Sequence, residues 1–471
     1  MGEQGAWRRC RITGVAAAIA VTFAAAGPAD AGISIYGRGL ADEPVPYLGD
    51  EELPPPTPPI LLFGNPFLST GPIDSGFELP TGAVWQPSLW VFGTYRTALQ
   101  SFDPANGPRV AEWANTLDLY ANLQLSATER VLLGMTPFRR GTSFSGYRFD
   151  GPGPDDGEGF ESFNGSVQTL FFEGDFGEIF PGLDRNDSDL LDYGFTVGRQ
   201  ALSFQQGLLM EDTAIDAVGI VRNSLTAPGI ANIRLSGLFA WGEISRADAV
   251  EDNDAKLFGF SGDADIGSHF VSFDSFYVES DDDTGDGFYF GAGTVQRKGL
   301  WDSAFRLMGS IALDDDTPAV RSGVLGFMSF STTPKTSDDI LYINAFVARN
   351  EFTQVARDPV VGGPLGRAGI LFSTQRLGQY GAPLSPRAKN VAGFTVGRQW
   401  FLVPTNREQL IVEFGGRVSW DDEPQGAGVA ARYQIQIHNQ AFLQFDLFGT
   451  YVDDVEDGFG VGARSELQIK F

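Results

Sequence analysis

The chain has 471 residues, and its 33 Lys and Arg against 60 Asp and Glu give a formal net charge of 33 − 60 = −27. An acidic surplus of this size repels phosphate backbones and argues against nucleic-acid binding. Apolar residues make up 42% of the chain, which argues against disorder. No apolar run reaches the roughly 18 residues of a membrane-spanning helix. A large all-β fold is the class that these features favour.

Residues 1–31 have the pattern of a secretory signal peptide. Arginines within residues 8–11 precede an apolar stretch over residues 14–26, and an A-x-A cleavage site ends at Ala31. The single cysteine, Cys10, lies before the apolar stretch and is removed with the signal. The mature chain therefore has no cysteine, so we expect neither disulfides nor thiolate metal sites.

Residues 32–87 are rich in Pro and Gly and are expected to form an extended periplasmic arm. The arm has two alternatives: it hangs free in the periplasm, or it forms a partial plug of the domain that follows. From residue 88 to residue 471 short alternating segments are separated by connections rich in Gly, Asp, Pro and Asn, which indicates strands and turns.

Side chains alternate across a strand, so each of these segments has one apolar and one polar face. The last segment shows this clearly, since Val461, Leu467 and Ile469 alternate with Arg464 and Glu466. In a soluble sandwich the apolar face turns inward, whereas in a membrane barrel it turns outward to lipid.

Three features favour the membrane barrel. The segments are long enough to cross a bilayer as tilted strands. Aromatic residues recur at strand ends, as interfacial girdles require, and the chain ends on Phe471 after an alternating strand. That ending resembles the C-terminal signature that the bacterial outer-membrane insertion machinery reads. The aromatic strand-end residues are Trp90, Trp113, Trp241, Trp301, Trp420 and Tyr451.

The pattern predicts an all-β, transmembrane, antiparallel up-and-down β-barrel of about 18 strands over residues 88–471. Short connections are assigned to the periplasmic side and long acidic ones to the outside; residues 180–192 and 223–230 are long exceptions on the periplasmic side. The predicted strands begin near Ser88, Arg109, Arg130, Ser166, Tyr193, Ala214, Ala231, Ala255, His269, Gly287, Leu300, Ala319, Asp339, Asn390, Glu408, Gly426, Ala441 and Gly458.

One heptapeptide occurs twice. Gly194–Gln200 (GFTVGRQ) recurs identically as Gly393–Gln399. Either two strands solve the same packing problem, or Arg199 and Arg398 project into a channel as an ion-selective pair.

At the first copy the sequence resembles the alginate-export family of outer-membrane porins. The residues that carry the resemblance are Thr196–Phe204 and Asp216–Gly219, and the match extends over about fifty residues. The resemblance implies an 18-stranded barrel with a basic lumen, and only Arg199 is matched among substrate ligands. The chain differs from the family in its strongly acidic composition.

Arginines on the polar strand faces are the predicted lumen and selectivity residues. An arginine stays charged and binds carboxylate or phosphate in a bidentate fashion, which suits an anion-conducting pore. The alternative is a ladder of salt bridges that stiffens the barrel. The candidates are Arg96, Arg199, Arg234, Arg306, Arg321, Arg398, Arg417, Arg432 and Arg464.

The connection from Arg349 to Lys389 is the one predicted loop that is basic, with Arg357, Arg367 and Arg376 among its cations. It either folds inward and constricts the mouth or makes a surface excursion.

No G-x-S-x-G, H-E-x-x-H or P-loop motif occurs, so we predict neither an enzyme nor a bound cofactor or metal. The acidic loop Asp281–Gly287 lacks the Glu that an EF-hand needs at its twelfth position. The expected function is a passive outer-membrane channel for anionic or polyhydroxylated solutes in a Gram-negative bacterium. The alternative is a closed structural or adhesive barrel. Expected partners are outer-membrane lipid, lipopolysaccharide, the insertion machinery at Phe471, and a small or polymeric anionic solute.

Overall fold

The computed structural model describes residues 57–65, 75–105, 107–152, 157–183, 191–281, 283–334, 337–403, 407–421, 423–453 and 458–471. The predicted signal peptide lies outside these residues. Among the residues described, no helix is long and apolar enough to cross a membrane.

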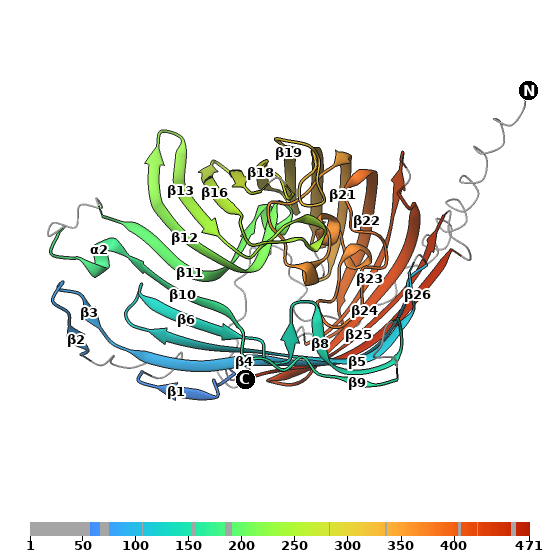
Figure 1. Ribbon diagram of the computed structural model, residues 1–471, viewed down its shortest axis with the longest axis horizontal. Coiled ribbons are helices and arrows are strands. Elements are labelled where there is room, and N and C mark those ends of the chain that lie inside the picture. Colours follow the sequence, from blue (N-terminus) through green and yellow to red (C-terminus); the bar gives the residue numbers. More distant parts are fainter. Residues whose placement is uncertain are drawn as a thin grey trace, which may run out of the picture.

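The structure is a closed antiparallel barrel of 18 strands, as predicted (Figure 1). Each strand pairs with the next along the chain, and the last strand pairs with the first, Val461 opposite Asp103. The barrel strands are β4 (Ser88–Asp103), β5 (Val110–Gln124), β6 (Arg130–Met135), β10 (Val167–Asp175), β11 (Tyr193–Phe204), β12 (Met210–Ala227), β13 (Ile230–Trp241), β16 (Lys256–Ile266), β17 (His269–Glu279), β18 (Gly287–Lys298), β19 (Trp301–Ala312), β20 (Gly323–Thr332), β21 (Ile340–Glu351), β22 (Lys389–Phe401), β23 (Glu408–Ser419), β24 (Gly426–His438), β25 (Ala441–Val452) and β26 (Phe459–Lys470).

All predicted strands are present, and most begin within a few residues of the predicted position. One predicted long turn is absent, because β12 continues to Ala227 and β13 begins at Ile230, which leaves only Pro228 and Gly229 between them. The other predicted long turn, residues 180–192, directly follows the short helix α2 (Phe176–Ile179). One end of the barrel thus has mostly short turns and the other has long loops; we call them the short-turn end and the long-loop end.

The third strand of the barrel is divided. β6 pairs with the part of β5 near the short-turn end, and β8 (Ser143–Asp150), which belongs to the following loop, pairs with the rest of β5. The wall therefore stays hydrogen-bonded although β6 is short, as a barrel wall in hydrocarbon requires.

The apolar strand faces point outward. On β25 and β26, Phe445, Leu447 and Val461 have exposed fractions of 41%, 60% and 58%, while Arg464 and Glu466 on the opposite face are each 3% exposed. Trp113, Trp241, Trp301 and Trp420 are also exposed, near strand ends. A band of apolar side chains that no protein covers is the surface that a bilayer requires.

Part of the N-terminal arm adds a strand beside the barrel seam. β1 (Leu61–Phe63) pairs with residues Leu89–Val91 of β4, and Figure 1 shows it alongside β4, close to the C-terminus. The pairing of β26 with β4 extends to Thr94, the backbone of Phe471 pairs with Gly93 at 2.7 and 3.1 Å, and β1 pairs with the residues of β4 that come before these. This part of the arm neither hangs free nor enters the lumen.

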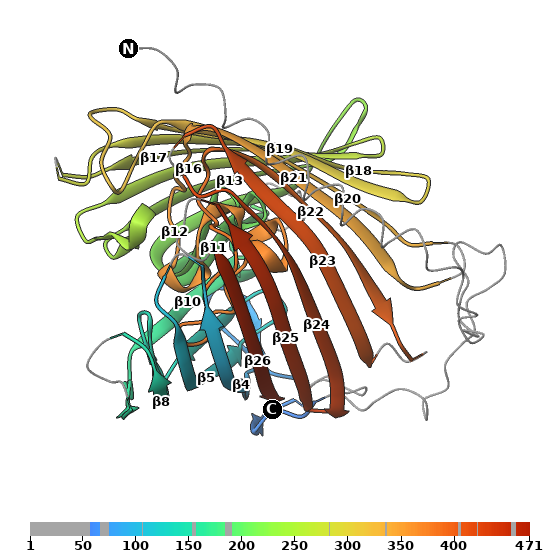
Figure 2. The same cartoon turned by 90° about the vertical axis from the view of Figure 1, so that its right-hand side faces the viewer.

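The basic connection between β21 and β22 folds into the barrel, which confirms the inward alternative. We call residues 352–388 the lumen loop. It contains the 3-10 turns η3 (Pro359–Val361), η4 (Pro364–Arg367) and η5 (Ile370–Phe372), and Figures 1 and 2 show these orange turns surrounded by the strands. Leu365, Leu371, Phe372 and Leu377 are fully buried, so the loop has a core of its own against the inner wall.

The outward orientation of Leu447 leads to a test. We expect Leu447→Lys to lower the free energy of unfolding by about 2–4 kcal/mol if this residue lies near the bilayer midplane, because the charge enters hydrocarbon. Urea unfolding in lipid vesicles measures it. The control is Gln434→Lys, on the polar face that Arg432 shares, where the cost should stay within about 1 kcal/mol. Equal losses for the two variants would show that Leu447 does not face lipid.

Candidate functional site: the barrel lumen

The lumen loop crosses the inside of the barrel. Two of its consecutive residues contact opposite walls: the side-chain oxygen of Gln375 accepts a hydrogen bond from Arg432 on β24 at 2.6 Å, and Arg376 forms an ion pair with Glu211 on β12 at 2.6 Å. In the closed order of strands, β12 and β24 lie on opposite sides of the barrel. The segment Gln375–Arg376 therefore spans the lumen from wall to wall, and we call this level of the barrel the constriction.

Buried polar side chains of the wall hold the loop in place. Glu413 on β23 is fully buried and accepts hydrogen bonds from the backbone N–H groups of Ile370 and Leu371 at 3.1 and 2.9 Å. Tyr342 donates a third, at 2.6 Å. Asn344 donates to the carbonyl of Ala368 at 2.8 Å. These bonds hold the turn η5 against the wall. If the turn moved away, the buried carboxylate of Glu413 would lose hydrogen-bond donors, which costs free energy.

Three loop arginines surround a single carboxylate at the constriction. Arg376 and Arg367 bind the two oxygens of Glu211 at 2.6 and 3.1 Å. Arg357 lies close to the same carboxylate and donates to the carbonyl oxygens of Gly207 and Val361, both at 3.1 Å. The backbone of Glu211 also pairs with that of the loop, since its N–H donates to Ala356 and its carbonyl accepts from Asp358, each at 3.0 Å.

The three arginines have different exposure. The side chains of Arg367 and Arg376 are 46% and 40% exposed, whereas Arg357 is almost fully buried. Burial lowers the pKa of Arg357 to about 9, and the negative charge of Glu211 opposes that shift. Arg357 therefore keeps its charge at neutral pH, and the four side chains carry a formal charge of 3 − 1 = +2.

A ladder of ion pairs lies on the wall from β24 to β4. Asp446 binds Arg432 at 2.6 Å and Arg464 at 3.1 Å. Glu466 binds Arg464 and, at 2.5 Å, Arg96. Both acids are 3% exposed. On this wall the predicted arginines form the stiffening ladder that was the alternative to a selectivity row, although Arg96 and Arg432 also contact Gln375 of the constriction.

Two further predicted arginines lie on the inner face of other strands. Arg234 pairs with Asp263 across β13 and β16. Arg306 shares its face with the buried Met308 and Ser310 on β19, opposite the exposed Leu307. Within the part of the chain that is described, Arg306 has neither an ion pair nor a hydrogen bond. It is thus the inner-wall arginine whose charge no protein carboxylate neutralises.

Two of the predicted lumen residues, Arg199 and Arg398, are wrong because both point outward. Arg199 lies opposite Asp216 on the face of the exposed Val197 and Val218, and it pairs with Asp216 at 2.9 Å and Glu243 at 2.6 Å.

Arg398 shares the outer face of the exposed Phe394; it pairs with Asp339 at 2.7 Å and lies over the ring of Trp400. The repeated heptapeptide thus solves the same packing problem twice. Its threonines, Thr196 and Thr395, point inward, and its arginines are neutralised near the two ends of the barrel.

The last two predicted residues anchor loops. Arg321 precedes β20 in a loop at the long-loop end, where it pairs with Asp248 at 2.8 Å and Glu351 at 3.1 Å. Arg417 on β23 is buried and donates to the carbonyl oxygens of Ser385 and Arg387 in the lumen loop.

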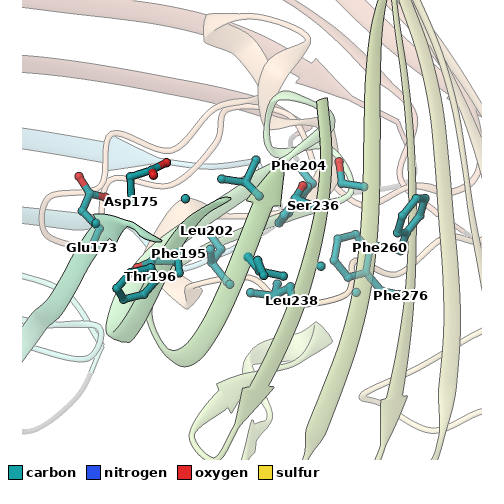
Figure 3. Close-up of a pocket in the computed structure, with 18 of the residues that line it drawn as sticks. Glu173, Asp175, Phe195, Thr196, Leu202, Phe204, Ser236, Leu238, Phe260 and Phe276 are labelled. Carbon is teal, nitrogen blue, oxygen red and sulfur yellow. The ribbon is translucent and has the colours of Figure 1, made fainter. Parts of the chain in front are cut away.

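The inner wall on the other side carries an apolar groove of about 400 Å³ (Figure 3). Leu202, Phe204, Leu238 and Phe276 line it, and the rings of Phe204 and Phe276 meet edge to face at 4.8 Å. Glu173 and Asp175 lie toward one end of the groove, at the left of Figure 3. Porin interiors are usually polar, so the lumen here has one charged wall and one partly apolar wall.

Sequence reasoning missed Glu211 and the apolar groove. Glu211 is more than 150 residues from Arg367, so no local spacing connects them. A weak signal existed, because a loop with several arginines and few acids needs its counter-charge from elsewhere in the chain. The groove also had a signal, because Leu202 and Phe204 alternate in step with the buried Gln200 on β11 and so place apolar side chains on its inner face.

No protein-family model and no curated protein sequence matches the chain, so the resemblance to alginate-export porins is not confirmed. Solved structures of outer-membrane porins do match in fold. A BenF-like porin from Pseudomonas fluorescens Pf-5 is similar at a TM-score of 0.55 and 11% identity, over 81% of this chain and 98% of that one. Pseudomonas aeruginosa OccK2 (OpdF) in complex with glucuronate gives 0.53 and 9%, over 81% and 98%.

A third structure, Pseudomonas aeruginosa OpdK with vanillate, gives a TM-score of 0.51 and 11% identity over 81% of this chain and 98% of that one. The chain therefore has the 18-stranded fold of outer-membrane porins. In that fold the short-turn end is periplasmic and the long-loop end extracellular.

The bonds to Glu413 predict how the lumen loop responds to their loss. We expect Glu413→Ala to leave two backbone N–H groups without an acceptor and to increase local opening of the loop roughly 30- to 100-fold, equal to about 2–3 kcal/mol. Trypsin cleavage after Arg367 and Arg376, followed by mass spectrometry in detergent micelles, measures the opening. The control Glu279→Ala removes a 4.0 Å ion pair at the outer rim and should cleave like the wild type. Cleavage of Glu413→Ala at the wild-type rate would mean that Glu413 does not hold the loop.

Proposed function

We propose that the protein is an outer-membrane channel through which small anionic or polyhydroxylated solutes diffuse passively. The observation that carries this proposal is that the loop segment which spans the lumen presents guanidinium groups to the solute path. Arg367 and Arg376 are partly exposed at the constriction, and Arg306 has no protein carboxylate to neutralise it. Such groups replace part of the hydration of an anion as it passes.

The overall charge of −27 does not contradict an anion path. Most acidic residues of the described lumen are engaged, as Asp446 and Glu466 are by arginines and Glu413 by N–H and O–H donors. Many other acids lie in loops and turns outside the strands. The local charge at the constriction, and not the net charge, decides which ions pass.

Neighbouring structures support the same class of solute. One similar porin structure contains glucuronate and another contains vanillate, and both ligands carry a carboxylate. Alginate, which the resemblance of the sequence suggests, is a polymer of the same charge type. We propose a carboxylated solute and consider an alginate-type polymer as the finer possibility, to be tested by uptake or export of uronate oligomers in a deletion strain.

The second candidate is a closed structural or adhesive barrel. It rests on the lumen loop, whose buried core occupies part of the interior. The two candidates differ in one measurable property, because a closed barrel conducts no ions in a planar bilayer.

Replacement of Arg306 tests the channel. We expect the wild type to conduct and to prefer anions, and Arg306→Ala to reduce the anion-to-cation permeability ratio by roughly three- to tenfold, since it removes an inner-wall charge that no described carboxylate pairs with. The reversal potential in a KCl gradient measures the ratio. Arg398→Ala removes an arginine from the outer face and is the matched control.

Two results would overturn this proposal. A folded wild-type protein without conductance would support the closed barrel. Conductance with equal selectivity in Arg306→Ala and Arg398→Ala would show that Arg306 does not act on the ions.

A further inference from the structure

The charges around Glu211 are arranged like a filled ligand site. Arg376 and Arg367 each bind one oxygen of this carboxylate through a single nitrogen, at 2.6 and 3.1 Å. A guanidinium has five N–H donors, so both arginines keep donors that the described residues do not use. Their side chains are nearly half exposed, whereas that of Glu211 is only 10% exposed. The cations face the open lumen, and the protein's own carboxylate covers their inner side.

The carboxylate of Glu211 is seated tightly from behind. Gly207 lies against it with φ +80°, and a Cβ atom there would overlap a carboxylate oxygen of Glu211 and crowd the Arg367 guanidinium. The backbone pairing of Glu211 with Ala356 and Asp358 fixes the position of the side chain relative to the loop. The backbone pairing and the close approach of Gly207 therefore determine the contact between Glu211 and the arginines.

The neighbouring acids do not compete for these arginines. Asp212 accepts hydrogen bonds from the backbone of Ala214 and Ser245 at 3.1 and 3.4 Å. Asp358 accepts from Thr213 and from the backbone of Val360, and Arg139 lies 3.9 Å from it. Among the described acids only Glu211 forms ion pairs with Arg367 and Arg376, while the buried Arg357 is stabilised by the charges of both Glu211 and Asp358.

We propose that Arg367 and Arg376 form a carboxylate-binding site at the constriction, and that Glu211 occupies this site as a tethered substitute which a passing carboxylate solute displaces. This inference rests on the proposed function as a channel for anions and specifies where the solute is held. The expected ligand is a carboxylate, because the site already holds the carboxylate of Glu211. The two oxygens of a carboxylate can each accept a hydrogen bond from one of the two guanidinium groups.

Exchange is energetically accessible. The guanidinium ends of both ion pairs are exposed, so water screens them on the lumen side, whereas the carboxylate of Glu211 is buried. A solute carboxylate can therefore compete with Glu211 for the exposed guanidinium groups of Arg367 and Arg376. A channel site must release its ligand as readily as it binds it. Release occurs when Glu211 forms its ion pairs with Arg367 and Arg376 again and displaces the solute.

Chemical labelling tests the site without relying on conductance. Phenylglyoxal modifies accessible arginines, and mass spectrometry quantifies labelling at Arg367 and Arg376, with glucuronate as the probe carboxylate. In the wild type we expect slow labelling and protection only at high glucuronate concentration. In Glu211→Gln, which keeps the size of the side chain but loses the charge, we expect labelling to increase severalfold and protection at a roughly tenfold lower glucuronate concentration.

Three further variants separate competition from loosening of the loop. Glu211→Asp keeps the charge and should behave nearly like the wild type. Asp263→Asn removes the carboxylate partner of Arg234 elsewhere in the lumen and should leave labelling at Arg367 and Arg376 unchanged. In Glu211→Gln combined with Arg376→Ala, the gain in protection at Arg367 should disappear.

The inference is overturned if glucuronate protects the wild type and Glu211→Gln at the same concentration, or if labelling does not rise in Glu211→Gln. General loosening of the loop would instead raise labelling in Glu211→Gln while glucuronate gave no stronger protection, which also overturns the inference. These results are independent of bilayer conductance, so an anion-selective wild type with unchanged protection in Glu211→Gln would remove this site and leave the proposed channel in place.

Discussion

The need to pair every backbone N–H and C=O group inside a bilayer governs this structure. Lipid offers no hydrogen-bond partner, so the strands close into a ring and β26 pairs with β4. Beyond the pairing of β26 and Phe471 with β4, the arm strand β1 pairs with the same edge of β4. Where β6 is short, β8 supplies the missing partner of β5. Closure then fixes the direction of each side chain, because alternation along a strand points every second residue into the lumen.

Closure also concentrates charge in a narrow space, and the protein manages that charge by pairing. Asp446 and Glu466 each bridge two arginines, and Glu413 is held by a phenol and two backbone N–H groups. Such buried groups are costly to leave alone. An arginine that escapes full pairing therefore stands out in this lumen. Among the described residues Arg306 is buried without an ion pair, whereas Arg367 and Arg376 are exposed at positions that a solute can reach.

The sequence predicted the barrel well, because strand periodicity and turn composition are local properties. Every predicted strand exists, and the outward faces with Leu447 and Val461 follow directly from alternation. The same rule could have corrected Arg199, since Phe195, Val197 and Arg199 alternate and share one face. An arginine on an apolar face is acceptable near a strand end, where Asp216 and Glu243 neutralise Arg199.

Prediction failed where contacts join distant segments. The partnership of Glu211 with the loop arginines depends on how the lumen loop crosses the barrel, and neither periodicity nor spacing encodes that path. The basic composition of the loop indicated an acidic partner without identifying it. The inward direction of Leu202 and Phe204, by contrast, follows from plain alternation with Gln200 along β11; the register shift at this point lies on β12, where Thr213 and Ala214 stand opposite Ala201 alone.

The two walls of the lumen differ, and this difference bears on how a solute passes. One wall carries the ion-pair ladder from β24 to β4, and the opposite wall carries the apolar groove over β11 to β17. The constriction joins them, because Gln375 contacts the ladder and Arg376 contacts β12 beside the groove. A solute with a charged end and a less polar body meets complementary surfaces in one orientation and loses contacts in the other. Orientation before the constriction reduces the entropy lost within it, so the asymmetry of the walls and the arginines of the loop act on the same solute in sequence.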